Sequence, residues 1–227
     1  EQIVKKCNKV LLNERKLRTP PSLDKKQLAS WNALLIKGLA VSGRVLERKD
    51  YIQSARESLE FIEKNQFDKN ILMACYINKM SKFPAYLDDH AFLLDAILEF
   101  LQSEWDTKLL HFAIKLADTL IDNFLDKEKG GFFFTRNNHE KLIFRSKPMS
   151  DDAMPSGNGI ACFTLQRLGF LVGDEKYLHA SKKTLESGFN LLKESPHGHL
   201  NLLNALEEYL DPPESIIIVG EKNKISE

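Results

Sequence analysis

Residues 89–113 read DHAFLLDAILEFLQSEWDTKLLHFA and contain the pattern that decides the fold. Between Ala91 and Leu101 the apolar residues fall on every side of a helix, which predicts a helix that is buried all round. From Trp105 to Phe124 apolar residues return every three or four positions, which predicts a helix with one wet face. The stretch therefore predicts a helical hairpin with an inner and an outer member.

Two further stretches, 31–55 and 157–181, repeat this plan. Alignment of the three inner helices brings six residues into register in two sets, Asn32, His90 and Asn158, and, 19 positions further on, Tyr51, Leu109 and Tyr177. Sequential pairs with buried inner helices close into an α/α barrel, whereas an open superhelix would leave the inner helices less apolar. We therefore expect an all-α fold, a partial (α/α)6 toroid of helical hairpins.

The pairs are too few for a complete ring. One helix is expected before them, over about 2–16, and one after them, over about 199–210. We expect an incomplete α/α-barrel domain over 1–212 and the start of a β-containing segment in 213–227, where a β-branched run begins. The chain is interpreted as a fragment of a longer protein.

A small β-hairpin insertion is expected between the second and third pairs. The apolar runs 130–135 and 141–145 flank the turn-like Asn137-Asn138, and this order is typical of a hairpin. A further run, 71–78, is expected to be a strand or an extended loop. Such insertions would cover one end of the ring.

Composition excludes several classes of function. The 227 residues carry 32 basic and 32 acidic side chains, so no surplus positive field is available for nucleic acid. The apolar runs are too short to span a membrane, and the first residues lack a signal-peptide core. Cys7, Cys75 and Cys162 stand far apart in no metal-type or redox spacing. We expect a cytoplasmic protein without metal, cofactor, nucleic-acid or membrane partners.

Each inner helix has polar residues at its N-terminal end. If the inner helices run parallel, these ends meet at one mouth, where the helix dipoles place partial positive charge. The candidate ligand-binding residues are Asp24, Trp31, Asn32, Tyr86, Asp88, Arg145, Asp151 and Asn158. The candidate catalytic residues are Asp89, Asp152 and His90.

Structural roles compete with these assignments. Asp88 and Ser156 are ordinary helix N-caps, and capping is the favoured explanation for both. His90 is more simply a buried core histidine, and Trp31 can pack rather than bind a sugar. The pair of histidines at 197 and 199 has no third ligand nearby, so a metal site is not expected.

The candidates define two types of chemistry. Two carboxylates facing each other across a ring can serve as acid and base for glycosidic bond cleavage. A histidine that titrates near neutrality can move a proton next to a sugar carbonyl, as in epimerisation or isomerisation. An enzyme would bring Asp89 and Asp152 into one open pocket. A non-catalytic scaffold, the alternative, would hold each in a cap or salt bridge.

Four stretches occur in an order that resembles a known family, namely 18–40, 86–100, 130–135 and 145–158. The sequence resembles thioredoxin-domain proteins of the spermatogenesis-associated type, whose barrel is similar to N-acylglucosamine 2-epimerases and six-hairpin glycosidases. The residues on motif positions are Asp24, Asn32, Asp88, Asp89, Asp151, Asp152 and Asn158. His90 departs from the tyrosine usual in the family.

The resemblance implies a partner in the same full-length chain and a class of ligand. A thioredoxin-like domain is expected upstream of residue 1, and a small carbohydrate-like ligand is expected at the mouth. Because an incomplete ring exposes apolar inner-helix surface, self-association is also expected.

Overall fold

The structure is a computed structural model that describes residues 1–140, 142–212 and 214. Its helices are α1 (Gln2–Lys16), α2 (Ala29–Val45), α3 (Lys49–Gln66), α4 (Leu87–Leu101), α5 (Thr107–Asn123), α6 (Gly157–Val172), α7 (Glu175–Glu194), the short 3-10 helix η1 (Pro196–Gly198) and α8 (Leu200–Leu210). Its strands are β1 (Gln27–Leu28), β2 (Phe67–Asp68), β3 (Ile71–Ile77) and β4 (Met80–Pro84).

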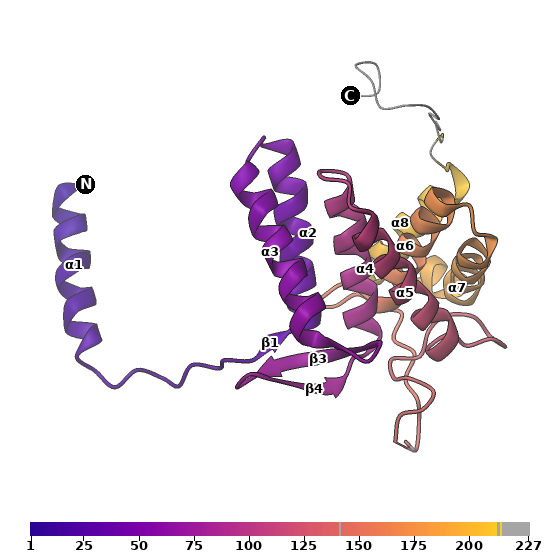
Figure 1. The fold of residues 1–227 in the computed structure, drawn as a ribbon, viewed down its shortest axis with the longest axis horizontal. Helices are drawn as coiled ribbons and strands as arrows, with labels where there is room; N and C mark the ends of the chain where they lie inside the picture. The colour runs from indigo at the N-terminus through magenta and orange to yellow at the C-terminus, as the bar shows by residue number, and fades with distance from the viewer. Residues whose placement is uncertain (141, 213, 215–227) are drawn as a thin grey trace.

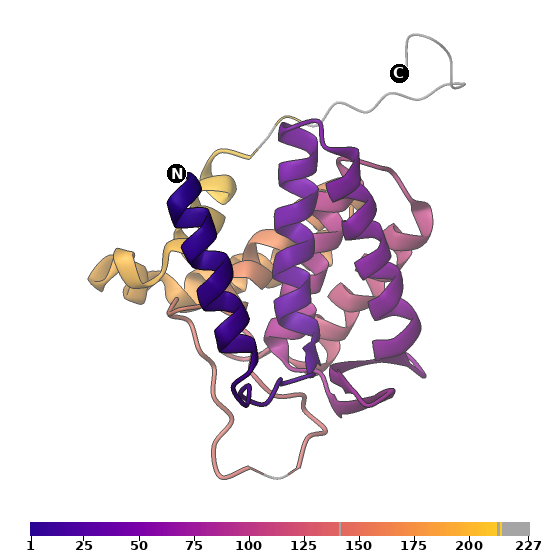
Figure 2. The ribbon, with the colours of Figure 1, turned by 90° about the vertical axis from the view of Figure 1, so that its left-hand side faces the viewer.

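The helices form two layers. In the inner row α2 packs on α4, α4 on α6 and α6 on α8, and the outer helices α3, α5 and α7 pack on α2, α4 and α6 in turn. Figure 1 shows the row from α2 to α8, and Figure 2 shows the α2–α3 hairpin in front of the later helices. This alternation of inner and outer helices confirms the predicted architecture.

The inner helices differ in how much of their own surface is buried. Apart from Asp88, which is partly buried, every residue of α4 is buried, as its apolar pattern predicts. The expectation is wrong for α2, which exposes Trp31, Leu35 and Val45 along one side. The physical reason is position, because α2 forms one edge of the row whereas α4 lies between α2 and α6.

Local side-chain and backbone chemistry sets where α5 and α7 begin and where α6 ends. Asp106 and Asp174 accept hydrogen bonds from the first-turn N–H groups of α5 and α7, which satisfies donors that a helix leaves free. Gly173 ends α6 in the left-handed region at φ 70°, where glycine has no steric cost. Trp105 lies before α5 and is exposed, so its predicted place on the apolar stripe is wrong.

Helix α1 stands apart from the rest of the chain. It lies where a helix over 2–16 was predicted, it buries no residue, and residues 17–26 join it to β1 (Figure 1). No helix among the described residues is long and apolar enough to cross a membrane.

A small antiparallel sheet lies before α4. β3 pairs with β1, β2 and β4, and its register with β4 runs from Met73 opposite Pro84 to Ile77 opposite Met80. Asn78 and Lys79 make the turn with positive φ values of 51° and 60°, as a two-residue hairpin turn requires. The run 71–78, expected to be a strand or an extended loop, forms β3, and the hairpin lies here, before α4, rather than between the second and third pairs.

The hairpin expected from 130–135 and 141–145 is wrong, since the described residues of this segment form no strand. Phe132 makes only an isolated bridge to Leu125. Its backbone bonds to Asn158 of α6, and the carbonyl of Phe134 accepts from the N–H of Leu87 at the start of α4. The apolar run is buried by helices rather than by a second strand. The predicted run after residue 214 lies outside the described residues.

Candidate functional site

The N-terminal turns of α2, α4 and α6 meet at one end of the row. The N–H of Ser30 on α2 donates to Oδ1 of Asp89 on α4, over 2.9 Å. A Cβ on Gly157 of α6 would lie 2.1 Å from Oδ1 of Asp88. The inner helices therefore run parallel and bring their polar ends to a shared mouth. The β3–β4 hairpin and the long loop before α6 lie at the same end (Figures 1 and 2).

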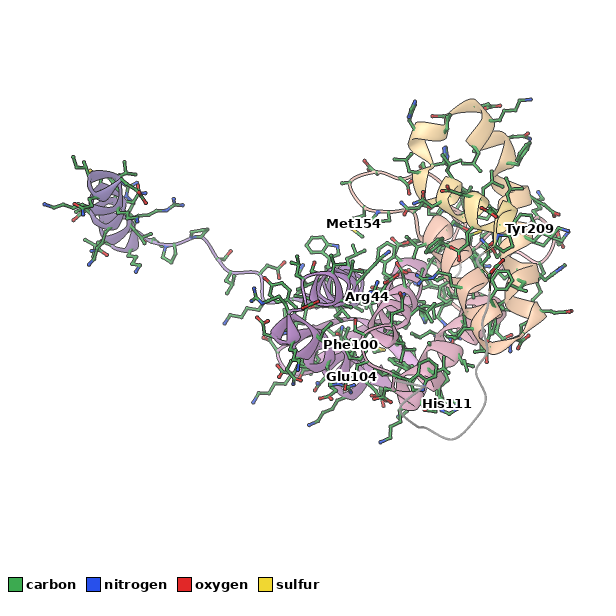
Figure 3. All side chains as sticks on the ribbon, turned by 90° about the horizontal axis from the view of Figure 1, so that it is seen from above. Arg44, Phe100, Glu104, His111, Met154 and Tyr209 are labelled. Atoms are coloured by element: carbon green, nitrogen blue, oxygen red, sulfur yellow. The ribbon has the colours of Figure 1, made fainter. Side chains whose placement is uncertain are left out.

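The loop before α6 reaches across this mouth to α2. The indole Nε1 of Trp31 donates to Sδ of Met154 over 3.2 Å, and Figure 3 shows Met154 on this loop. Trp31 is otherwise exposed, with 61% of its surface accessible. Asp152 lies two residues before Met154 and is exposed, while its backbone N–H bonds to the carbonyl of Met154.

Asp89 is held by backbone donors. Its carboxylate accepts from the N–H of Ser30 and from the N–H of Tyr86, each over 2.9 Å. Tyr86 is the N-cap of α4, so Asp89 completes a capping box. Burial raises the pKa of Asp89, while these hydrogen bonds act to lower it. The carboxylate therefore links α2 to α4, and little of its own surface is exposed to solvent.

Asp88, the neighbour of Asp89, is not held by hydrogen bonds in the same way. Its Oδ1 is buried and has no hydrogen-bond partner in the described part of the chain. Burial, and next the charge of Asp89, raise the pKa of Asp88 to about 6. A carboxyl group with such a pKa is partly protonated near neutral pH and can serve as a general acid.

His90 lies deeper, under the mouth. It is 1% exposed, its Nδ1 bonds to the carbonyl of Tyr86 over 2.8 Å, and its ring centroid lies 5.0 Å from that of Phe124. Burial lowers its pKa to about 4. The imidazole is therefore neutral at pH 7 and packs as a core side chain.

Asp151 and Asn158 hold loops in place. Asp151 accepts from the N–H of Ser156 over 2.7 Å and from the backbone and side chain of Asn201, each over 2.9 Å. Asn158 is fully buried and bonds to both backbone groups of Phe132 and to the carbonyl of Pro148. Their polar atoms are thus engaged within the fold.

The four remaining candidate ligand-binding residues lie at the edge of the mouth or away from it. Asp24 pairs with Lys26 in the exposed linker. Asn32 bonds to Leu28 and lines a cavity of about 350 Å³ against α3. Arg145 lies over the ring of Phe133, at 4.2 Å, beside a separate cavity of about 710 Å³ at the end of α5. Tyr86 stacks on Phe134 with ring centroids 5.0 Å apart.

An ion-pair network across the inner row was missed by the sequence analysis. Lys37 Nζ lies 2.6 Å from Asp95 Oδ2, and Glu99 bonds to Arg44 over 3.1 Å and to Arg167 over 2.7 Å. Burial opposes ionisation of Glu99, but the two arginines outweigh it and lower its pKa. The network ties α2, α4 and α6 together, and Figure 3 shows Arg44 between α2 and α4.

The repeat alignment contains a signal for this network. Lys37 and Asp95 each stand five positions after the aligned residues Asn32 and His90. Glu99 and Arg167 each stand nine positions after their own aligned residues. Opposite charges at equivalent positions of adjacent inner helices come into contact when the helices pack in parallel. Aligned positions could therefore have predicted both pairs.

No protein-family model matches the chain. The chain is similar to spermatogenesis-associated protein 20 of Homo sapiens, at 28% identity over 223 residues, and to that of Rattus norvegicus, at 27% over 222 residues. Each match covers 93% of this chain and 28% of the relative. The chain thus spans less than a third of the length of these relatives.

Solved structures with the same arrangement act on sugars. Cellobiose 2-epimerase from Bacillus thermoamylovorans matches with a TM-score of 0.62 at 14% identity, over 83% of this chain and 60% of that one. The α-mannanase of Bacteroides thetaiotaomicron matches with 0.64 at 15% identity, over 86% and 55%. A D-mannose isomerase matches with 0.57 at 12% identity, over 71% and 41%. The chain therefore has part of the α/α-toroid fold of these epimerases, isomerases and mannanases.

Proposed function

We propose that this chain is the carbohydrate-binding and carbohydrate-processing part of an α/α barrel, with its site at the mouth where α2, α4 and α6 begin. The observation that carries the proposal is Asp88, a partly buried carboxyl group without a partner for Oδ1 in the described chain. A protein that needed this residue only as a cap would be expected to satisfy that oxygen.

The proposed roles follow from the geometry. In glycosidic cleavage Asp88 donates a proton to the leaving glycosidic oxygen, because its raised pKa keeps a fraction protonated, while Asp152, on the loop that reaches Trp31, takes a proton from the water that attacks the anomeric carbon. In epimerisation Asp152 instead removes the proton from the carbon beside the sugar carbonyl, and Asp88 returns a proton to that carbon. Asp89 positions Asp88 by fixing the first turn of α4. The exposed indole of Trp31 offers an apolar face for a sugar ring.

One structural neighbour supports the assignment to consecutive aspartates. An α-1,6-mannanase of Salegentibacter is described as inactive when two consecutive aspartates are replaced by asparagine, in complex with α-1,6-mannotriose. It matches this chain with a TM-score of 0.55 at 16% identity. Asp88 and Asp89 form such a consecutive pair at the mouth of this chain.

The test compares the intact protein with its Asp88→Asn variant on cellobiose, D-mannose and α-1,6-mannotriose. Turnover of one of them is expected in the wild type, and the variant should lose at least about 100-fold of it while retaining binding. Asp211→Asn, at the exposed C-terminal end of α8, is the matched control and should turn over normally. If the wild type neither binds nor converts any of these sugars, the proposal is wrong.

A second candidate function is a non-catalytic scaffold that presents substrates to a thioredoxin-like domain of the same protein. The observation that favours it is the engagement of Asp89 and Asp151 in helix-capping hydrogen bonds. Under this alternative, Asp88→Asn leaves every activity of the intact protein unchanged. Removal of the barrel would instead reduce the activity of the attached domain.

A further inference from the structure

The segment 152–155, just before the N-cap of α6, contacts α2 across the end of the inner row. The indole Nε1 of Trp31 on α2 donates to Sδ of Met154 over 3.2 Å. Because α4 lies between α2 and α6, a segment that ends at α6 and reaches α2 passes over the first turn of α4. That turn contains Asp88, so the segment lies over the proposed site.

Both ends of this segment are fixed to the fold. Oδ1 of Asp151 accepts from the N–H of Ser156 over 2.7 Å, which joins the two ends to each other. Oδ2 of Asp151 accepts from the N–H of Asn201 on α8 over 2.9 Å. The N–H of Asp151 also donates to the carbonyl of Gly198 over 2.7 Å. Residues 152–155 therefore lie between two fixed points, where hinges can form.

The middle of the segment is held more weakly. In the described part of the chain, its hydrogen bonds are limited to one inside the segment, from the N–H of Asp152 to the carbonyl of Met154 over 3.1 Å, and the one from Trp31. Asp152 and Ala153 are exposed, whereas Met154 is half-buried against the apolar core. A thioether sulfur is a weak acceptor, so the hydrogen bond from Trp31 can break at small cost.

The position of Asp88 requires a movement in this region. A Cβ on Gly157, two positions after Pro155, would lie 2.1 Å from Asp88 Oδ1. This oxygen is buried, although Asp88 belongs to the first turn of a helix that begins at the mouth. A ligand that contacts the oxygen must therefore displace part of what covers it, and 152–155 can move between its fixed ends.

We propose that residues 152–155 form a lid over Asp88. The contact between Met154 and Trp31 holds this lid closed. Opening admits the ligand, and closure returns Asp152 to the mouth. Met154 is then a positioning residue, which acts through Asp152 and does not touch the reacting atoms. The lid rests on the contacts described above, whereas the role of Asp152 rests on the proposed function.

The test measures how fast a thiol at position 88 reacts with iodoacetamide. Asp88→Cys is introduced into the intact protein, and labelling at each cysteine is followed by peptide mass spectrometry. Because the lid must open before the reagent can reach position 88, Met154→Ala should accelerate this reaction at least about tenfold. Met80→Ala, at an exposed methionine of β4, is the matched control and should leave the rate unchanged.

Two native cysteines separate opening of the lid from unfolding. Cys75 in β3 and Cys162 in α6 are both buried, so their labelling reports loss of the fold itself. Their rates should stay unchanged in Met154→Ala. Equal acceleration at these two positions and at position 88 would mean that Met154 stabilises the fold as a whole, which would overturn the lid.

The contact can also be removed from α2. Trp31→Ala should accelerate the reaction at position 88 to a similar extent, and it carries the test if Met154→Ala does not fold. Since both changes break one contact, the double variant should add less than about twofold to either single variant. Independent effects that multiply in the double variant would show that Met154 and Trp31 do not act together, against the proposal.

The outcomes distinguish the lid from the proposed function. An unchanged rate at position 88 in both single variants overturns the lid, even if a sugar is bound and converted. An accelerated rate supports the lid, even if cellobiose, D-mannose and α-1,6-mannotriose do not bind. Where one of these sugars is converted, Met154→Ala should lower kcat at least about tenfold with a smaller change in KM, because it displaces Asp152 rather than the ligand. An unchanged kcat would contradict the positioning role of Met154.

Discussion

Asp88 combines a raised pKa with a buried oxygen that has no hydrogen-bond partner in the described part of the chain, and this combination lowers the stability of the folded protein near neutral pH. Between the ordinary aspartate value of 3.8 and about 6, the folded protein holds a proton that the unfolded chain releases. The free energy of unfolding therefore falls as pH rises through this window, by up to about 3 kcal/mol. Asp88→Asn removes this loss.

We accordingly predict that Asp88→Asn is more stable than the wild type at pH 7 and no more stable at pH 4. Urea unfolding at the two pH values measures the difference. Because the proposed function makes Asp88 the proton donor, the same variant is expected to lose activity, so stability and function should move in opposite directions. A variant less stable than the wild type at pH 7 would show that the carboxylate stabilises the fold.

Gly157 gives a second prediction for single residues. A Cβ at this position would lie 2.1 Å from Asp88 Oδ1 and 3.0 Å from Leu87 Cγ, so Gly157→Ala should destabilise the protein by about 1–3 kcal/mol through overpacking. Gly38→Ala is the matched control, because nothing lies within 4 Å of the added methyl group. It should be neutral or stabilising by up to about 1 kcal/mol. Similar effects of both changes in thermal unfolding would contradict the close approach of α4 and α6.

Among the secondary-structure elements, α6 and the loop before it depend on Asn158. Loss of its buried hydrogen bonds in Asn158→Ala leaves the N–H and carbonyl of Phe132 without partners, which should cost about 3 kcal/mol. Asn137→Ala removes one exposed bond, to the carbonyl of Asp122, and should cost less than about 0.5 kcal/mol. Denaturant unfolding of the two variants checks the contrast.

The inner helices are also joined by charge. Lys37→Met leaves the buried carboxylate of Asp95 with Arg167 as its one remaining cationic partner among the described residues, at 3.9 Å from Nη1, and should cost about 3 kcal/mol. The double variant Lys37→Met/Asp95→Leu should recover most of this loss. Arg48→Met, which breaks the exposed pair with Asp50, should cost less than about 1 kcal/mol. An additive double variant would mean that the two charges do not interact.

The sequence predicted the helices well because helical periodicity is local. The predicted position of the hairpin was wrong because Phe132 and Phe134 belong to an apolar, aromatic run that is typical of a strand. In the structure they instead contact Asn158 and Tyr86, which are distant in the sequence. The turn at Asn78-Lys79 was not recognised, since lysine rarely adopts positive φ.

The candidate site was predicted in outline only. The gathering of polar helix ends followed from the parallel inner helices. Which of two adjacent aspartates caps α4 depends on the phase of the first turn, and that phase gave the backbone contacts to Asp89 rather than to Asp88. The ion pairs of Asp95 and Glu99 were not predicted, because both residues lie within the apolar run 91–101. The roles of Asp89, Asp152 and His90 in catalysis stay predictions.

At the scale of the whole molecule, the row of helices has two open edges. α2 exposes Trp31, Leu35 and Val45, and α8 exposes Leu200, Leu203 and Leu210. The structural neighbours extend further, because this chain matches only 60% of the epimerase and 55% of the α-mannanase. In a toroid such edges are covered by further hairpins. Self-association through them stays a prediction.

The most direct measurement is a crystal structure of the intact Asp88→Asn protein with cellobiose or α-1,6-mannotriose. The account predicts a sugar at the mouth, in contact with the side chain at position 88 and with the indole of Trp31. A sugar bound elsewhere, or a mouth filled by other parts of the protein, would contradict the claim that the first turns of α2, α4 and α6 form a carbohydrate site.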